Sequence, residues 1–243
     1  MINLAKIANR IIKNSESPEI EYDKDGGKYL YVNGKLHNEN GPAIDRPGKS
    51  REWYTNGKHN REDGPAIEYA NGDKYWYINN KLHRVGGPAI ERKDGGKLWY
   101  INGELHREDG PAIEKANGDK KWYAHGLLHR EDGPAREFSN GDKIWYTHGK
   151  LHKTDGPAKE YVNGNKEWWI NDELHREDGP AIIERNGSKH WYFNGKRHRE
   201  DGPAVEKADG EKLWYLNGHE IEYDPETWDQ SIEEAKIESI MDE

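Results

Sequence analysis

The feature that most constrains this chain is an internal repeat of fixed length. Gly-Pro-Ala begins at Gly41 and returns every 23 residues as far as Gly202, without an insertion or a deletion. The aromatic pair at Trp53 and Tyr54 keeps the same step along the chain. A period of this length is typical of proteins that stack copies of one supersecondary unit. The sequence therefore indicates nine tandem repeats, and we do not expect a single thick core.

Each repeat carries two signals for a tight turn. Asn71 and Gly72 lie between two runs of strand-like residues, whereas Asn102 and Gly103 follow the aromatic pair. Two-residue hairpin turns need positive φ angles, which Asn and Gly tolerate. The proline of Gly-Pro-Ala lacks an N–H group and suits the first residue of a strand, so the Arg-Glu-Asp-Gly segment before it should separate repeats. The sequence thus predicts a small β-meander in every repeat.

The turns also predict a strand register. In the third repeat, a two-residue turn at each tip would place Ile67 opposite Trp76 and Tyr77 opposite Leu82. Neighbouring residues of a strand point to opposite faces, so the repeated Trp and Tyr should form two columns, one on each face of the sheet. One face would then combine Ile, Trp and His, and the other would combine Ala, Tyr and Leu.

Composition favours such thin layers over a globular core. Only 32% of the residues are hydrophobic and 34% are charged, while Trp and Tyr number 10 and 14 against 2 Phe and 2 Met. Aromatic rings with a polar end suit half-exposed layers, and their regular placement excludes a disordered chain. We predict an all-β repeat fold: an elongated, twisted antiparallel sheet or solenoid of nine 23-residue hairpin repeats, with a short capping helix at each end.

The two ends of the chain differ from the array between them. We predict an amphipathic helix within residues 1–18, the repeat array over residues 19–223 and an acidic helix within residues 224–243. Open sheets leave strand edges exposed, so both helices are expected to cap the array. Two alternatives remain open. The N-terminal helix could lie on a membrane surface, although its charges are mixed, and helices or sheet edges could join copies into a homo-oligomer.

Charge and cysteine usage limit the partners. The net charge is −9, but residues 219–243 hold ten acidic side chains against Lys236, so residues 21–218 are nearly neutral. A neutral array offers no basic stripe to phosphates, and we expect no binding to nucleic acid. The chain has no cysteine and no long apolar run. Disulfides and a membrane-spanning helix are therefore not expected, and the cytosol is the expected location.

One corner of the repeat resembles a known family. Asn-Gly-x-Leu-His, as at residues 102–106, follows the aromatic pair, and an Asn-Gly or Asp-Gly turn followed by aromatic residues comes later. Over residues 21–218 the chain resembles a MORN-type repeat, in particular the divergent MORN-like variety of bacteria, bacteriophages and large DNA viruses. It departs from the best-known pattern, because Arg-Glu-Asp-Gly-Pro-Ala replaces His-Gly-x-Gly and Trp-Tyr replaces Tyr-x-Gly. The resemblance implies stacked hairpins that serve protein contacts, and in some members lipid contacts, without catalysis, and it implies a virus-encoded protein.

The repeated histidines and acids suggest a metal hypothesis. His106 lies close in sequence to Glu108 and Asp109, and the same trio returns in other repeats. Equivalent histidines stand a whole repeat apart, roughly 10 Å or more at ~4.8 Å per strand, so neighbouring repeats cannot share one ion. We instead expect each His to cover a Trp and to hydrogen-bond the following loop, and Asp109 and its equivalents to cap a turn. Weak metal binding is the alternative, and no cofactor is expected.

Catalysis needs one constellation of residues that differs from its surroundings. Here every candidate side chain recurs in many repeats, so we predict no catalytic residue and no enzymatic activity. The departures from the repeat are few: Val85 and Gly86 replace Glu and Asp, Thr154 replaces Glu, and Trp169 replaces Tyr. Such divergence marks either a binding hot spot or drift, and both interpretations remain open.

The leading hypothesis for function is a cytosolic, virus-encoded module that binds and inhibits a host protein through its repeat surface. Arg and Trp are favoured at interface hot spots. The expected partner-binding residues are Arg107, Arg130, Arg176, Arg199, Trp99, Trp122, Trp145, Trp168, His106 and His129. One alternative is a sequestering protein that grips a small nucleotide-like ligand between rings and cations. Another is a purely structural scaffold.

Overall fold

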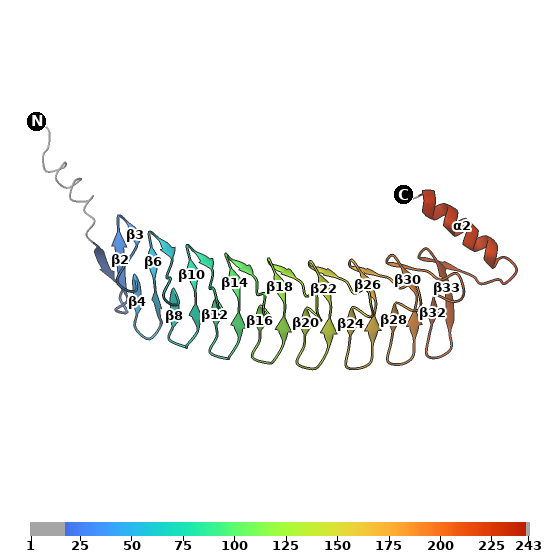
Figure 1. Ribbon diagram of the computed structural model, residues 1–243, viewed down its shortest axis with the longest axis horizontal. Helices are drawn as coiled ribbons and strands as arrows, with labels where there is room; N and C mark the ends of the chain where they lie inside the picture. Colours follow the sequence, from blue (N-terminus) through green and yellow to red (C-terminus); the bar gives the residue numbers. More distant parts are fainter. Residues whose placement is uncertain (1–17, 242–243) are drawn as a thin grey trace, which may run out of the picture. The chain divides into compact units, whose positions relative to one another are not determined.

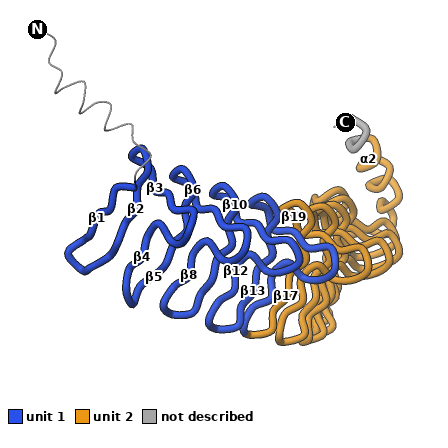
Figure 2. Tube along the Cα trace, turned by 60° about the vertical axis from the view of Figure 1, so that its left-hand side comes forward, with its two compact units in different colours: residues 1–116 blue, residues 117–243 orange. Residues whose placement is uncertain are grey.

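The structure of the chain is a computed structural model that describes residues 18–241 (Figure 1). Its residues fall into two compact units, 1–116 and 117–243, which Figure 2 distinguishes by colour. The amphipathic helix predicted for the N-terminus lies outside the described residues. Within each unit the predicted repeat of antiparallel hairpins is confirmed.

Unit 1 contains a ladder of antiparallel strands, each hydrogen-bonded to the next. Its strands, in order across the ladder, are β1 (Glu19–Tyr22), β2 (Lys28–Val32), β4 (Ile44–Arg46), β5 (Ser50–Glu52), β8 (Ile67–Tyr69), β9 (Lys74–Tyr75), β12 (Ile90–Glu91), β13 (Lys97–Leu98) and β16 (Ile113–Glu114). The register repeats along the ladder, as at Ile90, which pairs with Tyr75 on one side and Leu98 on the other. Backbone hydrogen bonds therefore join each repeat to its neighbour.

Unit 2 continues the same pattern in its own ladder. Its strands, in order, are β17 (Lys120–Lys121), β20 (Arg136–Glu137), β21 (Lys143–Ile144), β24 (Lys159–Glu160), β25 (Lys166–Glu167), β28 (Ile182–Ile183), β29 (Lys189–His190), β32 (Val205–Glu206), β33 (Lys212–Leu216) and β34 (His219–Ile221). Here Glu167 pairs with Lys159 on one side and Ile182 on the other. The two units thus use one construction principle.

A second, shorter hairpin follows the Trp of most repeats. In unit 1 these strands are β3 (Lys35–Leu36), which pairs with β2, then β6 (Tyr54–Thr55) with β7 (Lys58–His59), β10 (Tyr77–Ile78) with β11 (Lys81–Leu82), and β14 (Tyr100–Ile101) with β15 (Glu104–Leu105). In unit 2 they are β18 (Tyr123–Ala124) with β19 (Leu127–Leu128), β22 (Tyr146–Thr147) with β23 (Lys150–Leu151), β26 (Trp169–Ile170) with β27 (Glu173–Leu174), and β30 (Tyr192–Phe193) with β31 (Lys196–Arg197). Each repeat is therefore a meander, as predicted.

The first tip of the third repeat differs from the predicted two-residue turn. The backbone N–H of Tyr69 donates to the Asp73 carbonyl at 2.9 Å and closes a three-residue loop, within which the Gly72 N–H donates to the Tyr69 carbonyl at 3.0 Å. Gly72 has a φ of 101°, the left-handed conformation that ends such a loop. The extra residue shifts the register by one, so Ile67 pairs with Tyr75. The predicted pairing of Ile67 with Trp76 is therefore wrong.

The second tip follows the prediction. Tyr77 pairs with Leu82, and between them Asn79 and Asn80 have φ angles of 50° and 65°. Positive φ at both central residues is the mark of the tight turn that matches the twist of a hairpin. A non-glycine residue with positive φ occupies the same place in other repeats, as at His125 with a φ of 49°. The register of the second hairpin is thus confirmed.

The shifted register changes the neighbours of each Trp. One step beyond the Ile67–Tyr75 pair, Trp76 lies opposite Ala66. The backbone N–H of Trp76 donates to the carbonyl of Ala89 in the next repeat at 2.8 Å. Ala66 and Ala89 are fully buried, and Trp76 is 8% exposed. A methyl side chain on each side leaves room for the indole ring in a close-packed layer. The predicted grouping of Ala with Tyr is therefore wrong, because Ala accompanies Trp.

Two side-chain hydrogen bonds tie one repeat to the next. At the first tip, Asp142 Oδ1 accepts the backbone N–H of Val162 at 2.8 Å. At the second tip, His175 Nδ1 accepts the backbone N–H of Asn194 at 3.2 Å. Equivalent acceptors stand at Asp73, Asn165, Ser188, His83, His152 and His198. Because the donors are backbone groups, these links do not depend on which side chain the donor residue carries.

The C-terminal helix α2 (Trp228–Met241) covers the last strands of unit 2. Its Trp228 and Ala235 are buried together with Leu216 of β33. The indole N–H of Trp228 donates to the Glu200 carbonyl at 2.8 Å, which fixes the helix to the preceding loop. The predicted C-terminal helix is confirmed, and it shields the apolar residues at this end of the ladder.

Candidate interaction surface

From residue 61 onward, the loop that follows each short hairpin carries a cation stacked on the Trp of its own repeat. The guanidinium carbon of Arg107 lies 4.0 Å from the ring centre of Trp99. The stack recurs at Arg61 on Trp53, Arg84 on Trp76, Arg130 on Trp122, Arg176 on Trp168 and Arg199 on Trp191, with Lys153 on Trp145. A cation this close to the face of a Trp is attracted by the ring electrons. The cation thus takes the place over the Trp that we predicted for His.

The same arginine is held by three oxygen acceptors. Arg107 Nε donates to Asp109 Oδ1 at 2.8 Å, and Nη1 donates to the Pro111 carbonyl at 3.2 Å and to Glu114 Oε1 at 2.9 Å. The hydrogen bond from Arg107 holds the pKa of Asp109 below its ordinary value. We call this set of contacts, together with the Trp stack, the arginine clamp. Asp109 therefore supports the loop through the arginine, a more specific form of the predicted turn-capping role.

The glycine of Gly-Pro-Ala makes room for the arginine clamp. A Cβ atom on Gly110 would lie 3.0 Å from the guanidinium carbon of Arg107, closer than such atoms ordinarily approach. The corresponding distances at Gly64, Gly87, Gly133, Gly179 and Gly202 are 2.8 to 3.1 Å. The three residues of the signature thus have separate tasks. Gly admits the guanidinium, Pro supplies a carbonyl acceptor, and Ala leaves space beside the Trp.

Next to the stacked arginine, each complete loop presents a Glu and an Asp to solvent, and the Asp is also an acceptor of the clamp. The side chains of Glu108 and Asp109 are 91% and 85% exposed. The equivalent residues Glu131, Asp132, Glu177 and Asp178 are 91%, 84%, 82% and 82% exposed. We call each Glu-Asp combination an acidic pair. Because exposed ion pairs add little to stability, the charge of the acidic pair contributes less to folding than the buried side of the clamp.

The histidine at the start of each loop joins two repeats. His175 Nδ1 accepts a backbone N–H from Asn194, and its Nε2 lies 3.8 Å from Glu177 Oε1. The same Nδ1 also lies 2.8 Å from Asn194 Oδ1, so both polar contacts of this nitrogen are with the next repeat. The contact with Glu177 is too long for the predicted hydrogen bond to the loop, and the hydrogen bond of His175 goes to the next repeat instead.

The structure assigns intramolecular contacts to the predicted partner-binding residues. Arg107, Arg130, Arg176 and Arg199 are joined to the Trp of their own repeats, as given above, whereas Trp145 carries Lys153. His106 and His129 lie 3.8 and 3.9 Å from the glutamates of the following loops. Their role in partner binding stays a prediction. Sequence reasoning missed the glutamate seven residues after most of these arginines, although its regular spacing, as at Glu114, was a usable signal. Arg176 is the exception, because Ile183 stands at that place.

Two grooves open between successive loops at equivalent positions of the repeat. The first groove, about 590 Å³ in unit 1, is lined by the loop at residues 84–88, by Trp99 and Ile101, and by residues 106–109. The second groove, about 570 Å³ in unit 2, is lined by residues 153–156, by Trp168 and Ile170, and by residues 175–178. The two sites are three repeats apart in sequence. Both combine an aromatic and aliphatic lining with an acidic pair.

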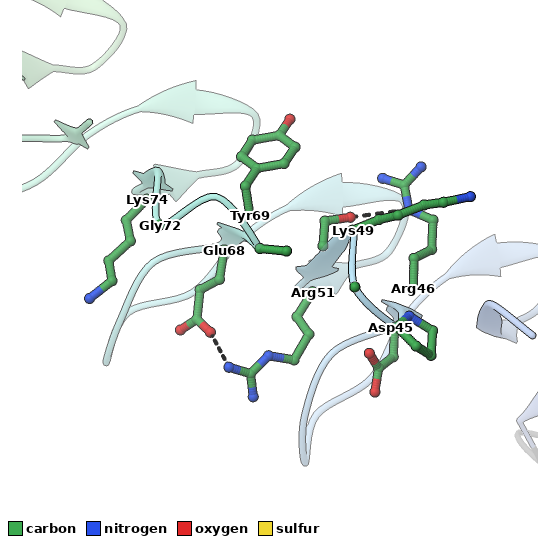
Figure 3. Close-up of a pocket in the computed structure, with 12 residues that line it drawn as sticks. Asp45, Arg46, Lys49, Arg51, Glu68, Tyr69, Gly72 and Lys74 are labelled. Carbon is green, nitrogen blue, oxygen red and sulfur yellow. Dashed lines mark hydrogen bonds and ion pairs between the residues drawn. The ribbon is translucent and has the colours of Figure 1, made fainter. Parts of the chain in front are cut away.

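A third pocket, of about 290 Å³, lies between the first tips of two repeats in unit 1 (Figure 3). Arg51 and Glu68 point toward one another there, with 2.7 Å between their nearest nitrogen and oxygen. Lys49 pairs with Asp25 at 2.9 Å. These cations already have carboxylate partners, so the pocket offers a ligand less charge than its lining residues suggest.

Beside this pocket, Glu52 is a buried acid at 6% exposure. His59, Ser50 and Tyr54 each place a polar atom 3.1 Å from its carboxylate, and Arg46 pairs with it. The hydrogen bond with His59, reinforced by the charge of Arg46, lowers the pKa of Glu52 from 4.5 to about 2 despite its burial. Burial and the neighbouring Glu52 in turn raise the pKa of Tyr54. The cluster satisfies its own polar groups, which indicates a structural role.

Two further properties concern metals and membranes. Among the side chains of residues 18–237, no three His, Cys, Asp or Glu groups gather closely enough to hold a metal ion. Over the same residues, no helix has the length and apolar character needed to span a bilayer.

Comparison with known protein families and with curated proteins finds no match to this chain. The MORN-like resemblance therefore stays a prediction. What the structure confirms is the coarser expectation of an all-β chain of repeated antiparallel hairpins with a C-terminal helix.

Proposed function

We propose that the chain is a non-enzymatic protein-interaction module whose contact surface is the row of acidic pairs. The observation that supports this proposal is the contrast within each loop. The clamp arginine Arg107 is 20% exposed, whereas Glu108 beside it is 91% exposed. The cytosolic location and the virus-encoded inhibitor role implied by the MORN-like resemblance belong to the same proposal.

Fixed loops favour binding because little conformational entropy is lost when a partner docks. The stack and the hydrogen bonds of Arg107 hold the backbone that carries the acidic pair. Equivalent carboxylates recur at a constant spacing in sequence, so a partner with regularly spaced lysines or arginines would meet several of them. Such a surface would also steer a basic partner toward the chain at low ionic strength.

The sequence suggested that the repeated arginines, the arginine row, contact the partner, and this proposal gives them a different role. The row consists of Arg107, Arg130, Arg176 and Arg199. The guanidinium of Arg176 donates to Asp178 and to the Pro180 carbonyl while it stacks on Trp168. A group engaged in this way has fewer donors to offer a partner. We therefore assign Arg and Trp to positioning, and the partner contact to the acidic pair.

The sequestering function is a second candidate because of the two grooves. Their volumes, about 590 and 570 Å³, lie within the range of about 300–1,000 Å³ that small-molecule sites occupy. However, Glu108 and Asp109 line the first groove and would repel the phosphate of a nucleotide-like ligand. This repulsion favours a protein partner over a nucleotide.

The test is zero-length crosslinking of the full chain to proteins in an extract of the cells that contain it. A carbodiimide joins a carboxylate directly to a lysine of a bound protein, so the crosslinked residue identifies the contact surface. We expect crosslinks at Glu108, Glu131 and Glu177. Native mass spectrometry of the chain purified from the same extract would reveal a retained small molecule.

The chain provides an internal control for this experiment. Glu104 and Glu173 lie on the short hairpins and are also exposed, so they react with the carbodiimide but lie outside the loops. Crosslinks concentrated on these two residues or on helix α2 would overturn the proposed surface. A retained nucleotide without any crosslinked protein would support the sequestering function instead.

A further inference from the structure

The two grooves lie where the sequence departs from the repeat. The first groove follows the loop in which Val85 and Gly86 replace Glu and Asp, and the second follows the loop in which Thr154 replaces Glu. In both, the residue two places after the Trp is isoleucine, Ile101 or Ile170. The sequence leaves open whether divergence marks drift or binding. The shared position of both grooves favours binding.

Folding does not require the divergent loop to carry an acid. Arg84 stacks on Trp76 at 3.9 Å and donates to the Pro88 carbonyl at 3.0 Å and to Glu91 at 2.7 Å. Gly86 stands where other loops place the Asp that accepts from Nε. The Trp stack and two of the clamp's hydrogen bonds thus persist in this loop while the acidic pair is lost. The backbone differs locally, because Gly86 has a φ of 74°, a left-handed conformation that the Asp of the other loops does not adopt.

The two sides of the first groove differ in polarity as a result. Val85, at 80% exposure, presents an apolar side chain on the side of the divergent loop. Glu108 and Asp109, at 91% and 85% exposure, stand on the side of the next loop. Trp99 and Ile101 also line the groove.

The second groove repeats this asymmetry in milder form. On one side Thr154 replaces the Glu but Asp155 remains, and Glu177 and Asp178, both 82% exposed, stand on the other side. Trp168 and Ile170 line it in the places of the Trp and Ile of the first groove. Both grooves therefore combine a Trp and an Ile with an acidic pair on one side and fewer acidic residues on the side of the divergent loop.

We propose that each groove binds a segment of a partner protein in which an apolar side chain stands next to a lysine or an arginine. The apolar side chain covers the Trp, the Ile and the divergent loop, and removal of this surface from water favours binding. The basic side chain meets the acidic pair of the next loop, which supplies complementary charge. This inference rests on the proposed function, because the acidic pairs of both grooves belong to the proposed contact surface.

The first experiment uses a blocked tetrapeptide, acetyl-Gly-Leu-Lys-Gly-amide, titrated into the ¹⁵N-labelled full chain. The indole N–H signals of the Trp residues report on binding. We expect saturable shifts at Trp99 and Trp168 with a Kd in the millimolar range, roughly −4 kcal/mol. Peptides with Gly in place of Leu, or Glu in place of Lys, should bind at least about fivefold more weakly. Equal affinity for all three peptides would overturn the proposal.

The second experiment removes the divergence. V85E, and separately T154E, restore the Glu of the other repeats on a backbone that accepts it, so both variants should keep the melting temperature of the parent chain. Each should abolish the shifts at one groove and leave those at the other. Unchanged binding of the Leu-Lys peptide by a folded variant would show that the divergent loops do not form the site.

A matched pair of variants tests the acidic side. Glu108→Gln with Glu177→Gln should weaken the Leu-Lys peptide several-fold, because the lysine loses its partners. Glu62→Gln with Glu131→Gln makes the same change in loops outside the two grooves and should leave the affinity within about twofold, the expected size of a remote charge effect. Equal losses in both pairs would indicate nonspecific attraction and overturn the groove assignment.

The outcomes separate this inference from the proposed function. If a crosslinked partner binds the V85E/T154E variant as tightly as the parent chain, the acidic pairs remain the proposed contact surface and the groove proposal is overturned. If the peptide binds at the grooves but the partner crosslinks only outside the loops, the grooves remain peptide sites and the proposed contact surface of acidic pairs is overturned.

Discussion

At the scale of single residues, the loop separates a structural side from an exposed side. Arg107 contacts Trp99, Asp109, the Pro111 carbonyl and Glu114. These contacts explain why Arg-x-Asp-Gly-Pro recurs with a fixed distance to the Trp before it. The sequence revealed the recurrence, but it could not show that the Arg and the Trp contact one another, because that depends on how the loop folds back over the strand.

The clamp predicts a stability cost for the loss of one arginine. Arg176→Ala should lower the free energy of unfolding by about 2 kcal/mol, because the stack and the charged hydrogen bonds are lost. Arg176→Lys should cost about half as much, since Lys153 shows that a lysine can take the stack, 3.7 Å from the centre of Trp145. Urea unfolding followed by Trp fluorescence measures both.

The control for this prediction is Lys120→Ala, which removes an exposed cation from β17. Its effect should stay within about 0.5 kcal/mol, as for most surface changes. If Arg176→Ala were as mild as Lys120→Ala, the clamp would be irrelevant to folding. The arginine row would then become the better candidate for partner contact, as the sequence first suggested.

The buried Glu52 predicts a pH dependence. Its folded pKa, about 2, lies below the ordinary 4.5, so the carboxylate contributes stability above pH 4.5 that is lost as the pH falls toward 2. A shift of this size corresponds to roughly 3 kcal/mol. Glu52→Gln should therefore flatten the fall in unfolding free energy between pH 4.5 and 2, measured by urea titration at several pH values. An identical fall in the variant would contradict the assigned pKa.

At the scale of elements, the number and order of hairpins followed from the positions of Asn, Gly and Pro. The second tip was predicted correctly, because two residues with positive φ, such as Asn79 and Asn80, specify one turn. The first tip was not, because Gly72 can end either a two-residue or a three-residue loop, and backbone hydrogen bonds decide between them. The one additional residue in the loop shifts the register, so that Ala66 rather than Ile67 lies opposite Trp76.

The candidate site was less predictable than the fold. Regular spacing identified the loops, the arginines and the acidic pairs as repeated features. Exposure could not be deduced from spacing, since Arg107 and Glu108 are neighbours in sequence and differ in exposure from 20% to 91%. The sequence showed that Val85, Gly86 and Thr154 diverge from the repeat, but it did not predict a groove beside them. The lining of each groove comes from two repeats that approach one another only in the folded chain.

The C-terminal helix supplies a prediction of its own. Trp228→Ala should lower the unfolding free energy by about 3 kcal/mol, since it removes a buried ring and its hydrogen bond to Glu200. It should also increase hydrogen exchange in β33 and β34. Ile237→Ala on the same helix is the control, because Ile237 is 58% exposed and should matter little. Equal effects of the two changes would contradict the packing of α2 on β33.

At the scale of the whole molecule, the chain repeats one loop many times and has a strongly acidic C-terminal segment. Because no group of three potential ligands occurs among the side chains of residues 18–237, we expect a divalent-metal chelator to leave the melting temperature unchanged. Differential scanning calorimetry with and without the chelator measures this. A drop of about 5 °C or more, restored by zinc or calcium, would correspond to a lost contribution of about 1 to 2 kcal/mol and would reveal a metal site.

The central claim is that the exposed acidic pairs, rather than the hairpins, contact the partner. The most direct test uses the partner that crosslinking identifies. Isothermal titration calorimetry would measure the affinity of this purified partner for the parent chain and for two matched double variants. Glu108→Lys with Glu177→Lys reverses charge in two loops, and Glu104→Lys with Glu173→Lys makes the same reversal on two short hairpins. The claim predicts an affinity loss of at least about tenfold, or 1.4 kcal/mol, for the loop variant and a change within about twofold for the hairpin variant. Equal losses, or a larger loss in the hairpin variant, would contradict it.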